Sequence, residues 1–270
     1  MKFLEHLTFG QYVPADSPVH RLDPRCKIIS MIVLLSGIFL ARHPMIFGAW
    51  GGLLAALTIL SKLPFRLVLR SARPVLVLVL FTASIHVFFT KGTPVLEYGI
   101  VSITREGLVL AAYMGLRLLF LVLFASFLTL TTKPMELSDG LERLFSPLVR
   151  FGFPAHELAM MMTIALRFIP TLLDETDRIM KAQLARGASL DRGGLWKRMK
   201  AFLPVLIPLF VIVFLRAEDL AVAMEARCYR GGQGRTRMNP LRWRIQDTVA
   251  GLAVLAAVLL LALGERGFFR

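Results

Sequence analysis

The stretch Pro154–Gly232, PAHELAMMMTIALRFIPTLLDETDRIMKAQLARGASLDRGGLWKRMKAFLPVLIPLFVIVFLRAEDLAVAMEARCYRGG, determines how the whole chain is interpreted. It carries too many charges to lie wholly in lipid and too regular an apolar period to be a disordered loop. Two short arginine-centred segments, Ala185-Arg186-Gly187 and Ala226-Arg227-Cys228, stand where amphipathic helices are expected to end. We therefore predict a cytoplasmic helical domain with membrane helices on both sides of it.

The composition indicates a membrane protein with a basic cytoplasmic surface. Hydrophobic residues make up 56% of the 270 residues and the mean hydropathy is +0.65, above the roughly 45–50% apolar content of soluble chains. Lys and Arg outnumber Asp and Glu by 32 to 18, a net charge of +14. Retention of basic residues on the cytoplasmic side explains this excess. No nucleic acid partner is expected, because the aromatic residues are not interleaved with the basic ones.

Apolar runs predict an all-α membrane protein with about five transmembrane helices plus a cytoplasmic domain of amphipathic helices. The loop Ser61–Arg73 carries four basic residues and no acid, which places it in the cytoplasm, with the N-terminus inside and the C-terminus outside. Residues 1–132 then hold a polar lead-in and four membrane helices, 133–244 the cytoplasmic domain, and 245–270 the last helix and a short external tail. The expected membrane helices are Ile28–Ala41, Met45–Leu60, Pro74–Thr90, Gly107–Thr132 and Ile245–Leu263.

The apolar segment Ala201–Leu215 is the exception to a simple hydropathy assignment. Pro204 and Pro208 interrupt it, and it is short for a membrane crossing. A crossing here would also export the arginine-rich segment that follows, against the charge rule. We expect a helix at the membrane face or against another helix, followed by a separate amphipathic helix over Arg216–Arg230.

Motifs for catalysis, metal binding or cofactor binding do not emerge. His156-Glu157 lacks the second histidine of a zinc protease motif, and neither GxSxG nor a Walker A lysine motif occurs. Cys26 and Cys228 form no CxxC or Cys/His cluster, and His86 alone is no ligand set. We expect no enzyme activity, no metal and no cofactor.

Arg117 lies near the middle of Gly107–Thr132. A cation at that depth costs about 2.5 kcal/mol or more, so it should face other helices. A structural contact between helices is favoured over a direct role in transport.

Arg186 and Arg227 allow two interpretations. A cation near a helix C-terminus complements the helix dipole, and this alone explains either residue. A guanidinium at a helix end can also bind a carboxylate or backbone carbonyls of a partner protein in a bidentate manner. Two such ends on one basic segment leave both interpretations open.

Several segments along the chain carry a resemblance to a known family: Gly10–Pro14 (GQYVP) with Ser17-Pro18, His20–Arg25 (HRLDPR), Leu130–Pro134 (LTTKP), Ala165–Pro170 (ALRFIP), Ala182–Gly187 (AQLARG) and Glu225–Gly232 (EARCYRGG). In these segments the chain resembles the transmembrane T subunits of energy-coupling factor (ECF) transporters, called EcfT in shared systems and CbiQ in the cobalt system. Arg117 also matches an intramembrane arginine of that family.

The resemblance implies a function and partners. Long coupling helices would place each Ala-Arg-Gly end, at Arg186 and at Arg227, in a groove of one of two ABC-type ATPases, identical or different. A membrane-embedded S subunit would bind the substrate, a vitamin or a metal ion, in the cell membrane of a prokaryote. Cys228 departs from the family pattern, which has glycine there. A cobalt- or nickel-dedicated T subunit and a stand-alone secondary transporter are the alternatives.

Overall fold

The computed structural model describes residues 12–41, 43–98, 101–188, 194–231 and 241–268. Its contacts divide the chain into two compact units. The first, here called the bundle unit, comprises Gly10–Gly140 and Pro240–Arg270, and the second, the helix-pair unit, contains Leu141–Asn239. The predicted domain boundaries, after residues 132 and 244, were defined by where the chain is expected to leave and re-enter the bilayer, whereas these units are defined by internal contacts. The predicted boundaries stay a prediction.

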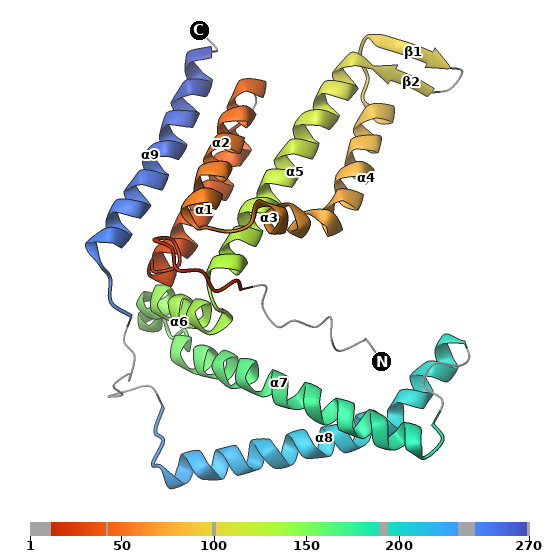
Figure 1. The fold of residues 1–270 in the computed structure, drawn as a ribbon, viewed down its shortest axis with the longest axis vertical. Coiled ribbons are helices and arrows are strands. Elements are labelled where there is room, and N and C mark those ends of the chain that lie inside the picture. The colour runs from red at the N-terminus through yellow and green to blue at the C-terminus, as the bar shows by residue number, and fades with distance from the viewer. Residues whose placement is uncertain (1–11, 42, 99–100, 189–193, 232–240, 269–270) are drawn as a thin grey trace. The chain divides into compact units, whose positions relative to one another are not determined.

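The bundle unit is helical, which confirms the predicted all-α membrane class (Figure 1). One local exception is an antiparallel hairpin between α4 and α5, in a segment expected to be a loop, with Glu97 opposite Ser102 and Tyr98 opposite Val101. The elements are α1 (Pro24–Leu40), α2 (Pro44–Leu60), α3 (Phe65–Ser71), α4 (Arg73–Phe89), β1 (Pro94–Tyr98), β2 (Val101–Thr104), α5 (Arg105–Thr131), α6 (Pro134–Phe145, which crosses into the second unit) and α9 (Ile245–Phe268). Helix α9 thus continues to Phe268 rather than ending at Leu263.

The core of the bundle unit lies among α1, α2, α5 and α9. The rings of Trp50 and Phe124 meet edge to face with centroids 5.8 Å apart, and both side chains are fully buried, a geometry that aromatic pairs favour. A Cβ atom at Gly37 would lie 2.6 Å from Val258 Cγ1 and 2.9 Å from Trp50. Only glycine therefore allows α1 to approach α2 and α9 this closely.

Polar groups join the start of α1 to the start of α9. Asp23 caps α1 by accepting from the backbone N–H of Arg25, and its carboxylate also receives the Arg25 guanidinium. Burial opposes ionisation of Asp23, but the bonds and charge of Arg25 outweigh it, so the pKa of this carboxyl lies below its ordinary value. Asp247 accepts from the backbone N–H groups of Asp23 and Arg244, both at 2.7 Å. One buried carboxylate thus holds the first turn of α9 against α1.

The helix-pair unit is built from α7 (Ala155–Ala185) and α8 (Leu195–Ala226), preceded by a 3-10 turn, Ser146–Phe151. The expectation of two separate elements, Ala201–Leu215 and Arg216–Arg230, is wrong, because α8 is a single helix of 32 residues. Pro208 has no N–H for the carbonyl of Pro204. The side chain of Gln183 on α7 donates to that carbonyl instead, at 3.1 Å, so the loss of the helical bond is offset by a neighbouring helix.

Length and composition identify a multi-pass membrane protein, although they do not pick the same helices as the charge pattern. Helices α5, α7, α9 and the part Met199–Ala226 of α8 are long and apolar enough to cross a membrane, and α3 with α4 would form a further span bent by 51°. The prediction that α1 and α2 cross and that α7 and α8 do not rests on loop charges and stays a prediction. Helices α1 and α2 do pack in one core with α5 and α9, whereas α7 and α8 pack together in the other unit.

The Asp247 contact makes a testable prediction about the bundle unit. Asp247→Ala leaves the N–H groups of Asp23 and Arg244 without acceptors, at a cost of about 1–3 kcal/mol for a buried donor. The matched control is Asp16→Ala, which removes an exposed pair with Arg21 worth at most about 1 kcal/mol. Thermal unfolding in detergent should show a clearly larger loss for Asp247→Ala, and equal losses would contradict the assigned role.

Candidate docking site at two helix ends

The end of α7 is a compact backbone cap that leaves Arg186 exposed. Arg186 is the C-cap residue, and Gly187 follows with φ 87°. The N–H of Gly187 donates to Leu184 O at 2.9 Å and that of Ala188 donates to Gln183 O at 3.0 Å. This pair of bonds is the Schellman motif, in which a left-handed residue ends the helix and satisfies its last carbonyls.

The end of α8 repeats the same geometry. Arg227 is the C-cap residue, the N–H of Cys228 donates to Glu225 O at 2.8 Å, and that of Tyr229 donates to Met224 O at 3.1 Å. Cys228 occupies the left-handed position with φ 56°, which costs a residue with a Cβ about 1–2 kcal/mol. The replacement of glycine therefore leaves the cap intact but strains it.

Both arginine side chains are exposed, and the residues before them, Ala185 and Ala226, are exposed as well. Within the described ranges, neither guanidinium makes a hydrogen bond or ion pair. The backbone bonds already satisfy the last carbonyls, so the five N–H donors of each arginine remain for another molecule. Each end also carries the negative pole of its helix dipole beside the cation.

The two ends lie far apart because of where the helices cross (Figure 1). Gln183 contacts Pro204, and Arg216 lies 3.9 Å from Glu175, so α7 and α8 run antiparallel through the contact. Arg186 is within one turn of the Gln183 contact, whereas Arg227 lies roughly 35 Å along α8 from Pro204 at 1.5 Å per residue. Their separation therefore favours two binding sites over one shared groove.

Arg117 has a partner at a helix end. Its Nη2 donates to the carbonyl of Ala41, the C-cap residue of α1, at 2.8 Å, and its Nη1 lies 3.7 Å from Met114 Sδ. Ala41 is fully buried, so this carbonyl has little access to other donors. This geometry is compatible with the structural contact between helices that the sequence favours. The role of Arg117 stays a prediction.

Sequence reasoning did not single out Gln183, Lys27 or Asp247. Each one satisfies a backbone group of a distant segment: Gln183 that of Pro204, Lys27 that of Thr131, and Asp247 that of Asp23. An acid three residues into an apolar helix, as at Asp247, is the one local signal, since it matches the N3 position of a capping box. The other two have no local signal.

This chain, a multi-pass helical membrane protein with an exposed arginine at each of two helix ends, is similar to known transporter subunits. A family model described as a cobalt transport protein, CbiQ, matches residues 15–238. The energy-coupling factor transporter transmembrane protein EcfT of Thermanaerovibrio acidaminovorans is 62% identical over 250 residues, 93% of each chain. The EcfT proteins of Acidaminococcus fermentans, 51% identical over 96% of this chain and 97% of its own, and of Bacillus subtilis, 44% identical over 95% and 98%, are similar throughout.

These matches cover most of the chain, and the protein belongs to the EcfT/CbiQ family. The resemblance noted in the sequence is thereby confirmed. Family membership also agrees with a transporter membrane subunit rather than an enzyme.

The strained cap makes a prediction about Cys228. Cys228→Gly should relieve the left-handed strain and stabilise the end of α8 by roughly 0.5–1 kcal/mol, the strain minus the extra entropy of glycine. Ala226→Gly, two residues earlier and still helical, should destabilise it by about 1 kcal/mol. Hydrogen exchange of the last turn of α8 measures both changes. Slower exchange in Cys228→Gly and faster exchange in Ala226→Gly are expected, and the same sign for both would contradict the strain.

Proposed function

We propose that this chain is the transmembrane coupling subunit of an ECF-type ABC importer. Arg186 and Arg227 would each dock on one of two cytoplasmic ATPases, and the membrane helices would hold the substrate-binding S subunit. The observation that carries the proposal is the pair of matching Schellman caps, which present an exposed arginine at each of two separated helix ends. The names of the similar EcfT proteins agree with it.

The caps favour docking because they hold each guanidinium at the extreme end of a rigid element. An arginine fork placed there can enter a groove and bind a carboxylate with two parallel hydrogen bonds. Four of the last helical carbonyls, those of Gln183, Leu184, Met224 and Glu225, do not compete for it, since they already accept backbone N–H groups of the residues after each arginine. Each helix end is therefore already ordered before the partner binds, which lowers the conformational entropy lost on binding.

The contacts between α7 and α8 would convert movement of the ATPases into movement of the membrane helices. Gln183 contacts α8 at Pro204, in the first third of that helix, and Glu175 lies near Arg216 further along. When ATP binding brings two ATPases together, the two docked ends would move relative to each other and change how the helices cross. That change would reach the S subunit through the membrane helices and release a vitamin or another micronutrient inside the cell.

A cobalt- or nickel-dedicated T subunit is the second candidate, because the matching family model is described as a cobalt transport protein. The names of the similar EcfT proteins favour the general EcfT role. A stand-alone secondary transporter is less favoured, since Arg117, its main polar candidate within the membrane, donates to the end of α1.

The docking proposal predicts the effect of removing both arginines. Arg186→Ala combined with Arg227→Ala should abolish co-purification of the ATPases, because truncation of one docked charge costs about 2–5 kcal/mol. The control is Arg178→Ala with Lys200→Ala, which removes one exposed cation from each of the same helices. Affinity purification in mild detergent, with partners identified by mass, gives the answer. Retention of both ATPases by the first variant, with an unchanged unfolding temperature, would refute docking through these ends.

The proposed orientation can be tested with the native cysteines. Cys228 is exposed and Cys26 is buried, so a membrane-impermeant maleimide should report on Cys228 alone. In intact cells that express the chain without its ATPases, Cys228 should stay unlabelled until the membrane is permeabilised. Lys91→Cys in a Cys228→Ser background is the control, since residue 91 is exposed and predicted to be external. Labelling of Cys228 from outside would mean that α8 crosses the bilayer.

A further inference from the structure

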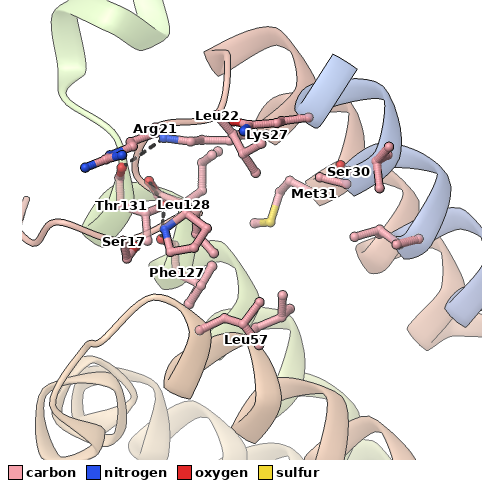
Figure 2. Close-up of a pocket in the computed structure, with 18 of the residues that line it drawn as sticks. Ser17, Arg21, Leu22, Lys27, Ser30, Met31, Leu57, Phe127, Leu128 and Thr131 are labelled. Atoms are coloured by element: carbon pink, nitrogen blue, oxygen red, sulfur yellow. Dashed lines mark hydrogen bonds between the residues drawn. The ribbon is translucent and has the colours of Figure 1, made fainter. Parts of the chain in front are cut away.

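A cavity of about 800 Å³ opens within the bundle unit, at the end where α1 begins and α5 ends (Figure 2). Its lining is mainly apolar, from Met31 and Leu34 on α1, Leu57 on α2 and Phe127 on α5. On the α9 side the lining residues are small or branched, among them Ala250, Ala253 and Val254. The volume and the mainly apolar lining suit a hydrocarbon chain rather than a polar solute.

Cations lie around this apolar lining. Arg21 and Lys27 lie on one side of the cavity in the close-up, away from Leu57 (Figure 2), and Lys62 lines it from the end of α2. Asp16 is the one acid among the lining residues, and it pairs with Arg21. The cavity therefore has a net positive rim.

Lys27 is the most constrained of these cations. It is only 6% exposed, and its Nζ donates to His20 O at 3.0 Å and to Thr131 O at 3.1 Å. An ammonium group has three donors, so one remains for an acceptor in the cavity. Three carboxylates act on the charge of Lys27, those of Glu136, Asp247 and Asp23. Asp23 and Asp247 are occupied by Arg25 and by backbone N–H groups, and Glu136 lies 3.8 Å from the Lys133 ammonium.

We propose that this cavity binds an anionic phospholipid. An acyl chain would lie between α1, α9 and the end of α5, and the phosphate would meet Lys62, Arg21 and the remaining donor of Lys27. Two observations select this occupant over a helix of another subunit: the charge of the rim, and its position at the ends of membrane helices, where lipid headgroups lie. With the predicted orientation, the lipid belongs to the cytoplasmic leaflet. The proposal concerns a lipid site separate from the ATPase-docking ends.

The test uses the full-length chain purified in mild detergent and mixed with dioleoyl phosphatidylglycerol or dioleoyl phosphatidylcholine, followed by native mass spectrometry. Each basic residue near a headgroup contributes about a fivefold preference for the anionic lipid. The variant Arg21→Gln with Lys62→Gln should therefore lose roughly 25-fold in phosphatidylglycerol affinity. The control Arg66→Gln with Arg70→Gln removes two exposed cations of α3 that do not line the cavity, and it should keep the preference.

A second pair of variants tests the apolar part. Ala253→Phe fills the cavity from α9 and should reduce binding of both lipids. Leu260→Phe, on the same helix but exposed and outside the lining, should not. Inorganic phosphate should fail to displace phosphatidylglycerol.

Several results would overturn the lipid site. Equal retention of the two lipids by the unaltered chain would do so, as would a preference that survives Arg21→Gln with Lys62→Gln. Unchanged lipid binding in Ala253→Phe would also contradict the lipid site. If that variant kept its lipid binding but lost a subunit of the complex, the cavity would be assigned to a protein partner. Thermal unfolding of each variant identifies any loss that comes from misfolding, and the Leu260→Phe and Arg66→Gln/Arg70→Gln controls keep the comparison valid.

Discussion

Backbone groups at buried helix ends must find partners within the protein, and this constraint explains Lys27, Arg117 and Asp247 in the bundle unit. Lys27 donates to the carbonyl of Thr131 at the end of α5, and Arg117 donates to that of Ala41 at the end of α1. Asp247 accepts from Asp23 where α1 begins. A cation at a carbonyl end and an anion at an amide end also match the helix dipoles. These contacts are sufficient to account for the charges in apolar surroundings without a transport path.

The helix-pair unit meets the same constraint without charged side chains. Helices α7 and α8 end on backbone bonds made by Gly187 and Cys228 and the residues that follow them, which leaves Arg186 and Arg227 exposed. Even the carbonyl left open by Pro208 is satisfied by a neutral amide, that of Gln183. The two units differ in what their arginines bind. An arginine that caps a buried helix end has its N–H donors occupied, whereas an arginine beside a cap already completed by backbone bonds remains available to a partner.

Local patterns in the sequence were sufficient for features that depend on local physics. The apolar period specifies α7, the apolar run specifies α5, and the glycine after Arg186 specifies the end of α7. Each of these signals lies within a few turns of the feature that it specifies. Pairings between distant segments were not accessible. Asp247 and Asp23 are 224 residues apart, and nothing near Arg117 indicates that Ala41 is its acceptor. The continuity of α8 was missed because the apolar run ends at Leu215 and charged residues begin at Arg216, a local change of composition that does not interrupt the helix. The donor that compensates for Pro208 lies on α7, outside any local pattern.

The position of the crossing gives the two proposed docking ends different mechanical roles. Arg186 lies beside the fixed contact between Gln183 and Pro204, and Arg227 lies at the far end of α8. For a rigid helix, a displacement at the distant end rotates α8 about that contact, whereas one at the near end mainly translates it. The hydrogen bond from Gln183 to the carbonyl left open by Pro208 would therefore also lie at the point about which α8 turns. A local bend at Pro208 would let the far end move without the rest, so a donor to that carbonyl favours transmission along the whole helix.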